Sequence, residues 1–348
     1  RNSQSFLEGA VILTSATVLV KVIGAFFKIP LANILGGVGM SYFVTAYDIF
    51  TPIYSLTVTG LGIAVSRMVS EYSACGNRAG VEAVLRAAQR IFVTLGIFGA
   101  AVLLAAAPHF VHIINNDAAL FAVLAIVPAV LFSCISSIYR GYYQGLSNML
   151  PTAMSQVLES VTRLIVGIAA AYVTARLMMA KYMASGQLFG LTFDGEKYAE
   201  LFIMRFAAAG AIGGVTLSTA VGALYIRRRF LAEHTDCRVQ CPAQKQREIG
   251  KKLIAIAIPI ALSTLVVNIS ALIDLTTVMN CLHTAIEKSG NAILSMYPKG
   301  IPPEISFDML PEYLYGSYSG LAYSIFNLIP AITAAFGVSA IPAVSRAW

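Results

Sequence analysis

The chain has 348 residues, of which 57% are hydrophobic and only 12% are charged. A water-soluble domain of this length needs far more surface charge, so the composition excludes that class and predicts an integral membrane protein. The net charge is +7, but the basic residues cluster between apolar stretches and form no continuous face for nucleic acid. We therefore expect the lipid bilayer, and no nucleic acid, as a partner.

About eight apolar stretches are long enough to cross a bilayer as helices. They lie near residues 9–35, 41–69, 87–113, 118–142, 151–178, 201–226, 250–279 and 319–345. Several contain proline or glycine, which membrane helices tolerate when neighbouring groups satisfy the freed backbone. The sequence therefore predicts an all-α, polytopic helical bundle.

The distribution of lysine and arginine predicts the orientation of the bundle. With the N-terminus in the cytoplasm, the basic segments 67–90 and 227–252 lie inside, and the less basic loops 179–200 and 280–318 lie outside. The opposite orientation would reverse this bias. We predict a multi-pass protein of the cytoplasmic (cell) membrane with a cytoplasmic N-terminus.

An internal repeat lies within the apolar stretches. Residues 46–50 read AYDIF and residues 322–326 read AYSIF, and both stretches close on a Ser-Arg pair, at Arg67 and at Arg346. Chance similarity between apolar helices is the alternative, but a shared pentamer with a shared terminus favours a true repeat. Repeated hairpins are typical of transporters built from two related halves.

The repeat and the basic segment divide the chain into three parts. Residues 1–229 form an N-terminal six-helix lobe, 230–249 form a basic cytoplasmic linker, and 250–348 begin a second, repeat-related lobe with two helices. A symmetric two-lobe transporter would continue further. We therefore expect the chain to be a fragment of a longer protein or a natural truncation.

A polar stripe marks the stretch at 151–178. Gln156, Glu159, Arg163 and Gly167 follow one another at intervals of three or four residues, so they share one helix face. A charge inside a bilayer costs roughly 3 to over 10 kcal/mol and needs a partner or a water-filled cavity. We predict that the stripe lines a central cavity and binds substrate. The alternative is a self-neutralising Glu159–Arg163 pair that joins this helix to a neighbour.

Three charges lie in the first two stretches. A turn near Gly36 would bring Lys28 and Asp48 to similar depths, where they can pair. Ser324 replaces Asp48 in the repeat, so this carboxylate is specific to one half. Lys21 has no partner in its own hairpin and suits an anionic group such as a diphosphate. Snorkelling toward an interface is the alternative.

The remaining polar residues give weaker signals. Asp274 and Asn268 are candidates for an ion or cavity site, or for ordinary interfacial residues, and Arg140 is interpreted as interfacial. The cysteines and histidines form no disulfide framework or metal set, and we find no nucleotide loop or catalytic triad. We predict a non-enzymatic protein without a cofactor, with an ion gradient or the membrane potential as the candidate driving force.

One segment resembles a known family. Residues 139–164, YRGYYQGLSNMLPTAMSQVLESVTRL, are similar to the polysaccharide-biosynthesis branch of the multidrug/oligosaccharidyl-lipid/polysaccharide (MOP) exporter superfamily, and within it to the stage V sporulation protein B type. Residues 6–50 and GLGIAVSRMVSEY at 60–72 follow the first two spans of that family. The resemblance covers nearly the whole chain.

The resemblance implies two six-helix lobes around a central cavity. It also implies flipping of polyprenyl-diphosphate-linked oligosaccharide or peptidoglycan precursors by alternating access, with this anionic lipid-linked glycan as partner. Flippases of the superfamily engage the diphosphate with cations in their first spans. Lys21 falls where they commonly place an arginine, whereas Phe27 occupies the second such position and Lys28 follows one residue later.

Two other functions stay open from the sequence. A cation-coupled multidrug efflux pump of the same superfamily needs an ion-binding carboxylate but no phosphate-binding cation, so Lys21 and Lys28 favour the flippase. A non-transporting membrane assembly factor would fit a truncated second lobe.

Overall fold

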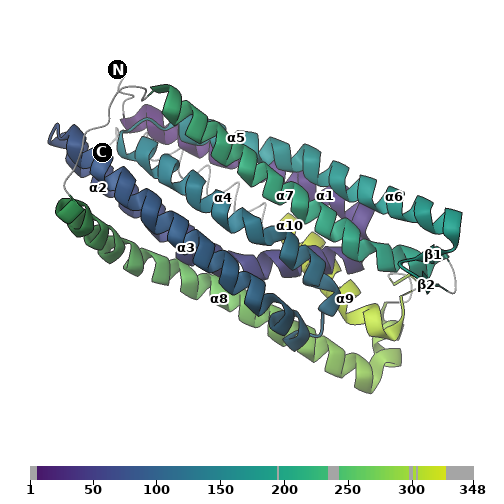
Figure 1. Cartoon of the computed structure of the whole chain (residues 1–348). Coiled ribbons are helices and arrows are strands. Elements are labelled where there is room, and N and C mark those ends of the chain that lie inside the picture. Colours follow the sequence, from purple (N-terminus) through teal and green to yellow (C-terminus); the bar gives the residue numbers. More distant parts are fainter. Residues whose placement is uncertain (1–5, 194–195, 234–242, 298–300, 303–304, 327–348) are drawn as a thin grey trace, which may run out of the picture.

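The computed structural model describes residues 6–193, 196–233, 243–297, 301–302 and 305–326 (Figure 1). The α-helices are α1 (Phe6–Tyr54), α2 (Gly60–Ala74), α3 (Arg78–Ile113), α4 (Leu120–Gly145), α5 (Leu150–Thr162), α6 (Ile168–Ser185), α7 (Glu196–Glu233), α8 (Ala243–Met296), α9 (Leu310–Tyr315) and α10 (Tyr323–Phe326). Three π-helical turns join consecutive helices: η1 (Ser55–Thr59), η3 (Arg163–Gly167) and η5 (Gly316–Ala322). Two short 3₁₀ turns are η2 (Asp117–Ala119) and η4 (Phe307–Met309).

Six helical segments of the described part are long and apolar enough to cross a membrane. They are Val11–Ala74, Arg78–Ile113, Asp117–Gly145, Leu150–Ser185, Glu196–Glu233 and Arg247–Met296. The sequence predicted about eight spans. The first two predicted spans fall within the single segment Val11–Ala74, and most of the predicted span 319–345 lies outside the described residues.

The segment Val11–Ala74 is a hairpin of two helical arms. Gly36 has a φ of 61° and a ψ of −173°, so the helical path breaks there, in a backbone region that glycine adopts without strain. Phe27 and Phe43, on opposite sides of Gly36, contact each other with ring centroids 5.9 Å apart. The chain therefore reverses near Gly36, where the sequence predicted a turn.

The long helices lie side by side in one bundle (Figure 1). Helix α8 runs along α3 at one edge, and α5, α6 and α7 lie toward the opposite edge. Large apolar side chains point outward, such as Phe98 at 66% exposure and Val266 at 70%. Such side chains are stable against hydrocarbon rather than water, which agrees with a membrane-embedded bundle.

Two polar contacts join α8 to earlier parts of the chain, one near each of its ends. Lys252 Nζ lies 2.9 Å from Glu71 Oε1 of α2. Near the other end of α8, Asn115 Nδ2 donates a hydrogen bond to Asn280 Oδ1 at 2.9 Å. Because 28 helical residues span about 42 Å, these contacts lie on opposite sides of a hydrocarbon core of about 30 Å.

Two predicted outer loops contain more regular structure than expected. In 179–200, helix α6 continues to Ser185, and the antiparallel strands β1 (Gln187–Leu188) and β2 (Leu191–Thr192) form a small hairpin before α7. In 280–318, helix α8 extends to Met296, although non-helical backbone at Ser289 (φ −147°, ψ 31°) breaks its path. Helix α6 ends just before Gly186, whose φ of 67° forms a left-handed cap, and the first proline after the apolar stretch of α8 is Pro298.

The three predicted parts of the chain stay a prediction. Helix α7 ends at Glu233 and α8 begins at Ala243, so helical ends extend into the predicted linker 230–249. Residues 234–242 lie outside the described part, as does the second Ser-Arg pair of the repeat. The first copy, 46–50, lies in α1, and the second copy, 322–326, covers α10 and the last residue of η5.

Candidate functional site

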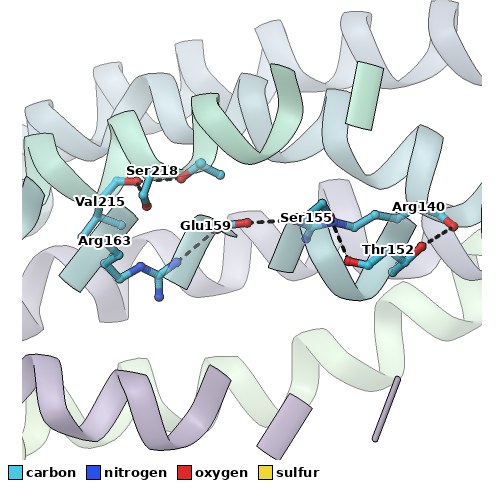
Figure 2. A network of polar contacts seen from close by, with 8 residues as sticks. Arg140, Thr152, Ser155, Glu159, Arg163, Val215 and Ser218 are labelled. Atoms are coloured by element: carbon cyan, nitrogen blue, oxygen red, sulfur yellow. Dashed lines mark hydrogen bonds and ion pairs between the residues drawn. The ribbon is translucent and has the colours of Figure 1, made fainter. Parts of the chain in front are cut away.

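The tight turn between α4 and α5 brings charged side chains of both helices together (Figure 2). Arg140 lies five residues before the end of α4, and Ser155 lies five residues after the start of α5, so the antiparallel hairpin places them at the same level. Arg140 Nε donates a hydrogen bond to Ser155 Oγ at 2.9 Å, and its Nη2 donates to Glu159 Oε2 at 2.9 Å. The sequence prediction treated Arg140 as interfacial and missed this contact.

Glu159 also binds Arg163, as their spacing on one helix predicts. Arg163 Nη2 lies 3.1 Å from Glu159 Oε1, so each oxygen of this carboxylate accepts from a different guanidinium (Figure 2). Arg163 begins the π-helical turn η3. Such turns interrupt the regular helix and frequently occur at functional sites.

The neighbouring helices leave room for this network, which we call the arginine–glutamate triad (Arg140, Glu159 and Arg163). A side chain at Gly222 of α7 would meet Glu159 Oε2 at 3.3 Å, so glycine makes space for the carboxylate. Tyr47 and Tyr54 of α1 lie close enough to Glu159 and Arg163 for electrostatic interaction. The three triad side chains are only 13–28% exposed, so the network lies between helices.

A second cluster joins the first hairpin to the segment that follows α8. Tyr315 of α9 donates a hydrogen bond to Asp48 Oδ2 at 3.0 Å. Lys28 of the opposite arm of α1 interacts electrostatically with Asp48, as the turn near Gly36 predicts. Asp274 of α8 interacts electrostatically with Tyr315. We call Lys28, Asp48, Tyr315 and Asp274 the Asp48 cluster.

Three predicted site residues stand apart from both groups. Lys21 is exposed on α1 and forms no hydrogen bond or ion pair within the described part of the chain. Gln156 is half-buried on the α5 stripe. Asn268 donates its side-chain amide to the carbonyl oxygen of Thr264 one turn earlier in α8, at 2.9 Å, so its polar group is satisfied locally.

The two groups meet on α1, where Tyr47 lies next to the triad and the following residue, Asp48, centres the other cluster. Across the residues that the structure describes, no set of three or more His, Cys, Asp or Glu side chains is placed to hold a metal ion. The triad holds two cations around one carboxylate, whereas the Asp48 cluster holds one cation and two carboxylates. The guanidinium donors of the triad are chemically suited to an anion.

The fold defines the class of protein: a polytopic helical membrane protein with the fold of the MOP superfamily. An outward-facing multidrug resistance MATE family transporter of that superfamily aligns with 96% of this chain and 71% of its own length, with a TM-score of 0.57 and 15% identity. An inward-facing MATE transporter aligns with 90% of this chain and 64% of its own, with a TM-score of 0.53 and 16% identity. At these identities the likeness concerns the fold alone.

The chain belongs to the polysaccharide biosynthesis protein family, whose profile matches residues 6–348. Stage V sporulation protein B of Bacillus subtilis (strain 168) is 35% identical over 162 residues, 46% of this chain and 31% of that protein. Lipid II flippase MurJ of the same organism is 25% identical over 352 residues, 96% of this chain and 59% of that protein. The chain thus matches less than two thirds of either relative, and the family predicted from residues 139–164 is confirmed.

Proposed function

We propose that this chain is part of a transporter that flips polyprenyl-diphosphate-linked oligosaccharide or peptidoglycan precursors across the cytoplasmic membrane by alternating access. The observation that supports it most is the charge held inside the bundle, in the triad and the Asp48 cluster. Charges at such positions are costly and usually mark a polar pathway. A carrier of a charged headgroup needs such a pathway, and a relative named as a lipid II flippase aligns along nearly all of this chain.

The proposed substrate-binding residues lie on three parts of the bundle: α1, α5 and α8. Lys21 is the exposed cation of α1, available to the diphosphate. Lys28 and Asp48 interact electrostatically near α9, while Gln156, Glu159 and Arg163 lie on the polar face of α5. Asp274, the exposed member of the Asp48 cluster, and Asn268 would contribute a polar or ion-binding wall on α8.

The orientation belongs to the same proposal. With a cytoplasmic N-terminus, the α4–α5 turn lies on the cytoplasmic side, because it follows an even number of crossings. The triad then lies in the half of the bundle closer to the leaflet in which such precursors are made. A substrate headgroup that enters from the cytoplasmic side would reach the triad before it reaches the opposite side of the membrane.

Complementation tests this function. Lys21→Ala in the full-length protein should abolish growth of a flippase-deficient strain while the protein level stays normal, and Lys21→Arg should retain more activity because it keeps the charge. Arg176→Ala is the control, since Arg176 is exposed and stacks on Tyr172 of its own helix. Wild-type growth with Lys21→Ala would show that the substrate is bound elsewhere, and no growth with the unmodified protein would contradict the function.

Cation-coupled drug efflux is the second candidate, favoured by the MATE fold and by the half-buried carboxylate of Asp48. The cations Lys21, Arg140 and Arg163 count against it, because a cationic drug would be repelled. Protection of a drug-sensitive strain, lost in Asp48→Asn, would support efflux over flipping.

A further inference from the structure

The arginine–glutamate triad is not neutral. Two guanidinium cations share one carboxylate, so the group keeps one net positive charge. A purely structural ion pair inside a membrane would be balanced, because each uncompensated charge is costly there. An excess cation at this position is explained if an anion completes the site.

The triad also keeps unused hydrogen-bond donors. Arg140 uses Nε and Nη2 in its contacts with Ser155 and Glu159, and Arg163 uses Nη2 with Glu159. Arg163 Nε is buried and has no hydrogen-bond partner among the described residues. Buried donors are nearly always paired, so an unpaired one indicates a group that binds there. The partner must be an acceptor, because guanidinium nitrogens only donate.

The geometry selects the class of acceptor. Glu159 holds the two guanidinium groups on its two different oxygens, and they approach this carboxylate from opposite sides (Figure 2). Arginine forks match the tetrahedral oxygens of phosphate better than a lysine does, since they can bind in a bidentate way. The side chains of Arg140 and Arg163 are 17% and 28% exposed, so they are enclosed but not sealed.

We propose that Arg140 and Arg163, held in place by Glu159, form a binding site for a phosphate group, and that Arg140 is a ligand-binding residue of this protein. The ligand that fits the proposed function is the diphosphate of the lipid-linked substrate, so the identity of the ligand rests on that function. The binding chemistry itself does not. Glu159 carries the same charge sign as the ligand, so it does not bind the ligand itself; it pairs with the two arginines and competes with the ligand for their donors.

Calorimetric titration of the full-length protein in phosphatidylcholine nanodiscs with inorganic pyrophosphate tests the site. Arg140→Ala and Arg163→Ala should each weaken binding by about tenfold or more, as expected when one charge-assisted contact is lost. Arg140→Lys should retain part of the affinity, because it keeps the charge without the fork. Arg86→Ala is the matched control, since Arg86 forms an i,i+4 pair with Glu82 at 3.2 Å, like that of Arg163 with Glu159.

Glu159→Gln separates binding from a structural role. It removes the negative charge and frees the donors that the carboxylate occupied, so pyrophosphate should bind more tightly even though the protein is less stable. If the triad were only structural, Glu159→Gln would lower the stability of the protein, and pyrophosphate binding would be unchanged or lost. Equal pyrophosphate affinity in the wild type and in Arg140→Ala, or weaker binding in Glu159→Gln that is still folded, would overturn the proposal.

A second titration identifies the source of the phosphate. Nanodiscs with phosphatidylglycerol supply a phosphate from the bilayer. Arginine-dependent pyrophosphate binding that survives this lipid supports a substrate site, whereas its displacement supports a phosphate site occupied by bilayer phospholipid. These measurements need no transport. Loss of arginine-dependent pyrophosphate binding would refute the phosphate site, although complementation could still support the flippase. Pyrophosphate binding without complementation would refute the flippase alone.

Discussion

Tyr315 donates a hydrogen bond to Asp48 Oδ2 at 3.0 Å across a sequence separation of 267 residues. Asp48 lies within the first copy of the repeat, and Tyr315 lies seven residues before the second copy. Tyr315 is buried and Asp48 is half-buried. This contact therefore ties the first hairpin to the beginning of its repeat.

Tyr315→Phe should lower the stability of the purified protein by about 1 kcal/mol, because the hydroxyl is lost and Asp48 keeps its charge. In a double-mutant cycle, adding Asp48→Asn should cost less than the two single changes together. Thermal unfolding in detergent gives both values. Tyr318→Phe is the control, since Tyr318 is 58% exposed, and an equal loss there would contradict a specific Asp48–Tyr315 contact.

Glu159→Gln should destabilise the protein by about 3–5 kcal/mol, because two guanidinium groups lose their shared carboxylate. Arg163→Gln should cost less, since Glu159 stays paired with Arg140. Chemical denaturation of the two variants measures the difference.

The half-buried pair Glu82–Arg86, whose side chains are 22% and 37% exposed, provides the comparison for this prediction. Glu82→Gln should cost under about 1 kcal/mol, as is usual for pairs near water. If Glu159→Gln were no worse than Glu82→Gln, or if Arg163→Gln were as harmful as Glu159→Gln, the central position of Glu159 in the triad would be wrong.

Gly316→Ala should separate α1 from the segment after α9. A methyl group at Gly316 would clash with the carbonyl oxygen of Gly37, and that backbone atom cannot move aside as a side chain can. We expect a loss of about 1–3 kcal/mol, typical of overpacking. Gly213→Ala in α7 is the matched control, because nothing lies within 4 Å of the added group. Equal unfolding temperatures for the two variants would refute the close contact.

Cysteine labelling tests the orientation. Cys281 and Cys75 are both exposed, and they lie near Asn280 and Glu71, which belong to the two polar contacts at opposite ends of α8. An impermeant maleimide added to intact cells should label a variant with Cys281 as its only cysteine, and not one with only Cys75. It should not label Cys237 or Cys241, which lie outside the described residues. Labelling of Cys75 but not Cys281 would reverse the topology.

The membrane spans could be predicted because long apolar stretches are required by the thickness of the bilayer. The turn at Gly36 was predictable too, since glycine separates two such stretches. The ends of α6 and α8 were not: α6 continues to a left-handed cap at Gly186, and α8 continues past a break at Ser289 to Met296. Hydropathy predicts where the hydrocarbon region ends, but it does not predict where a helix ends.

The site was predictable only within a helix or a hairpin. The pair of Glu159 and Arg163 follows from their spacing of four residues. Arg140 and Ser155 lie at similar distances from the α4–α5 turn. This spacing alone could have placed Arg140 opposite Ser155 and near Glu159. Tyr315 had no such signal, because its contact with Asp48 depends on how distant helices pack in three dimensions.

We propose that the protein moves a lipid-linked diphosphate across the membrane, and exposure of that lipid on the outer leaflet measures this movement most directly. In cells depleted of their own flippase, the full-length protein should make the lipid-linked precursor accessible to an impermeant enzyme that cleaves its headgroup, and Lys21→Ala should prevent this at an equal protein level. A precursor that stays inaccessible while the wild-type protein is present in the membrane would contradict the account.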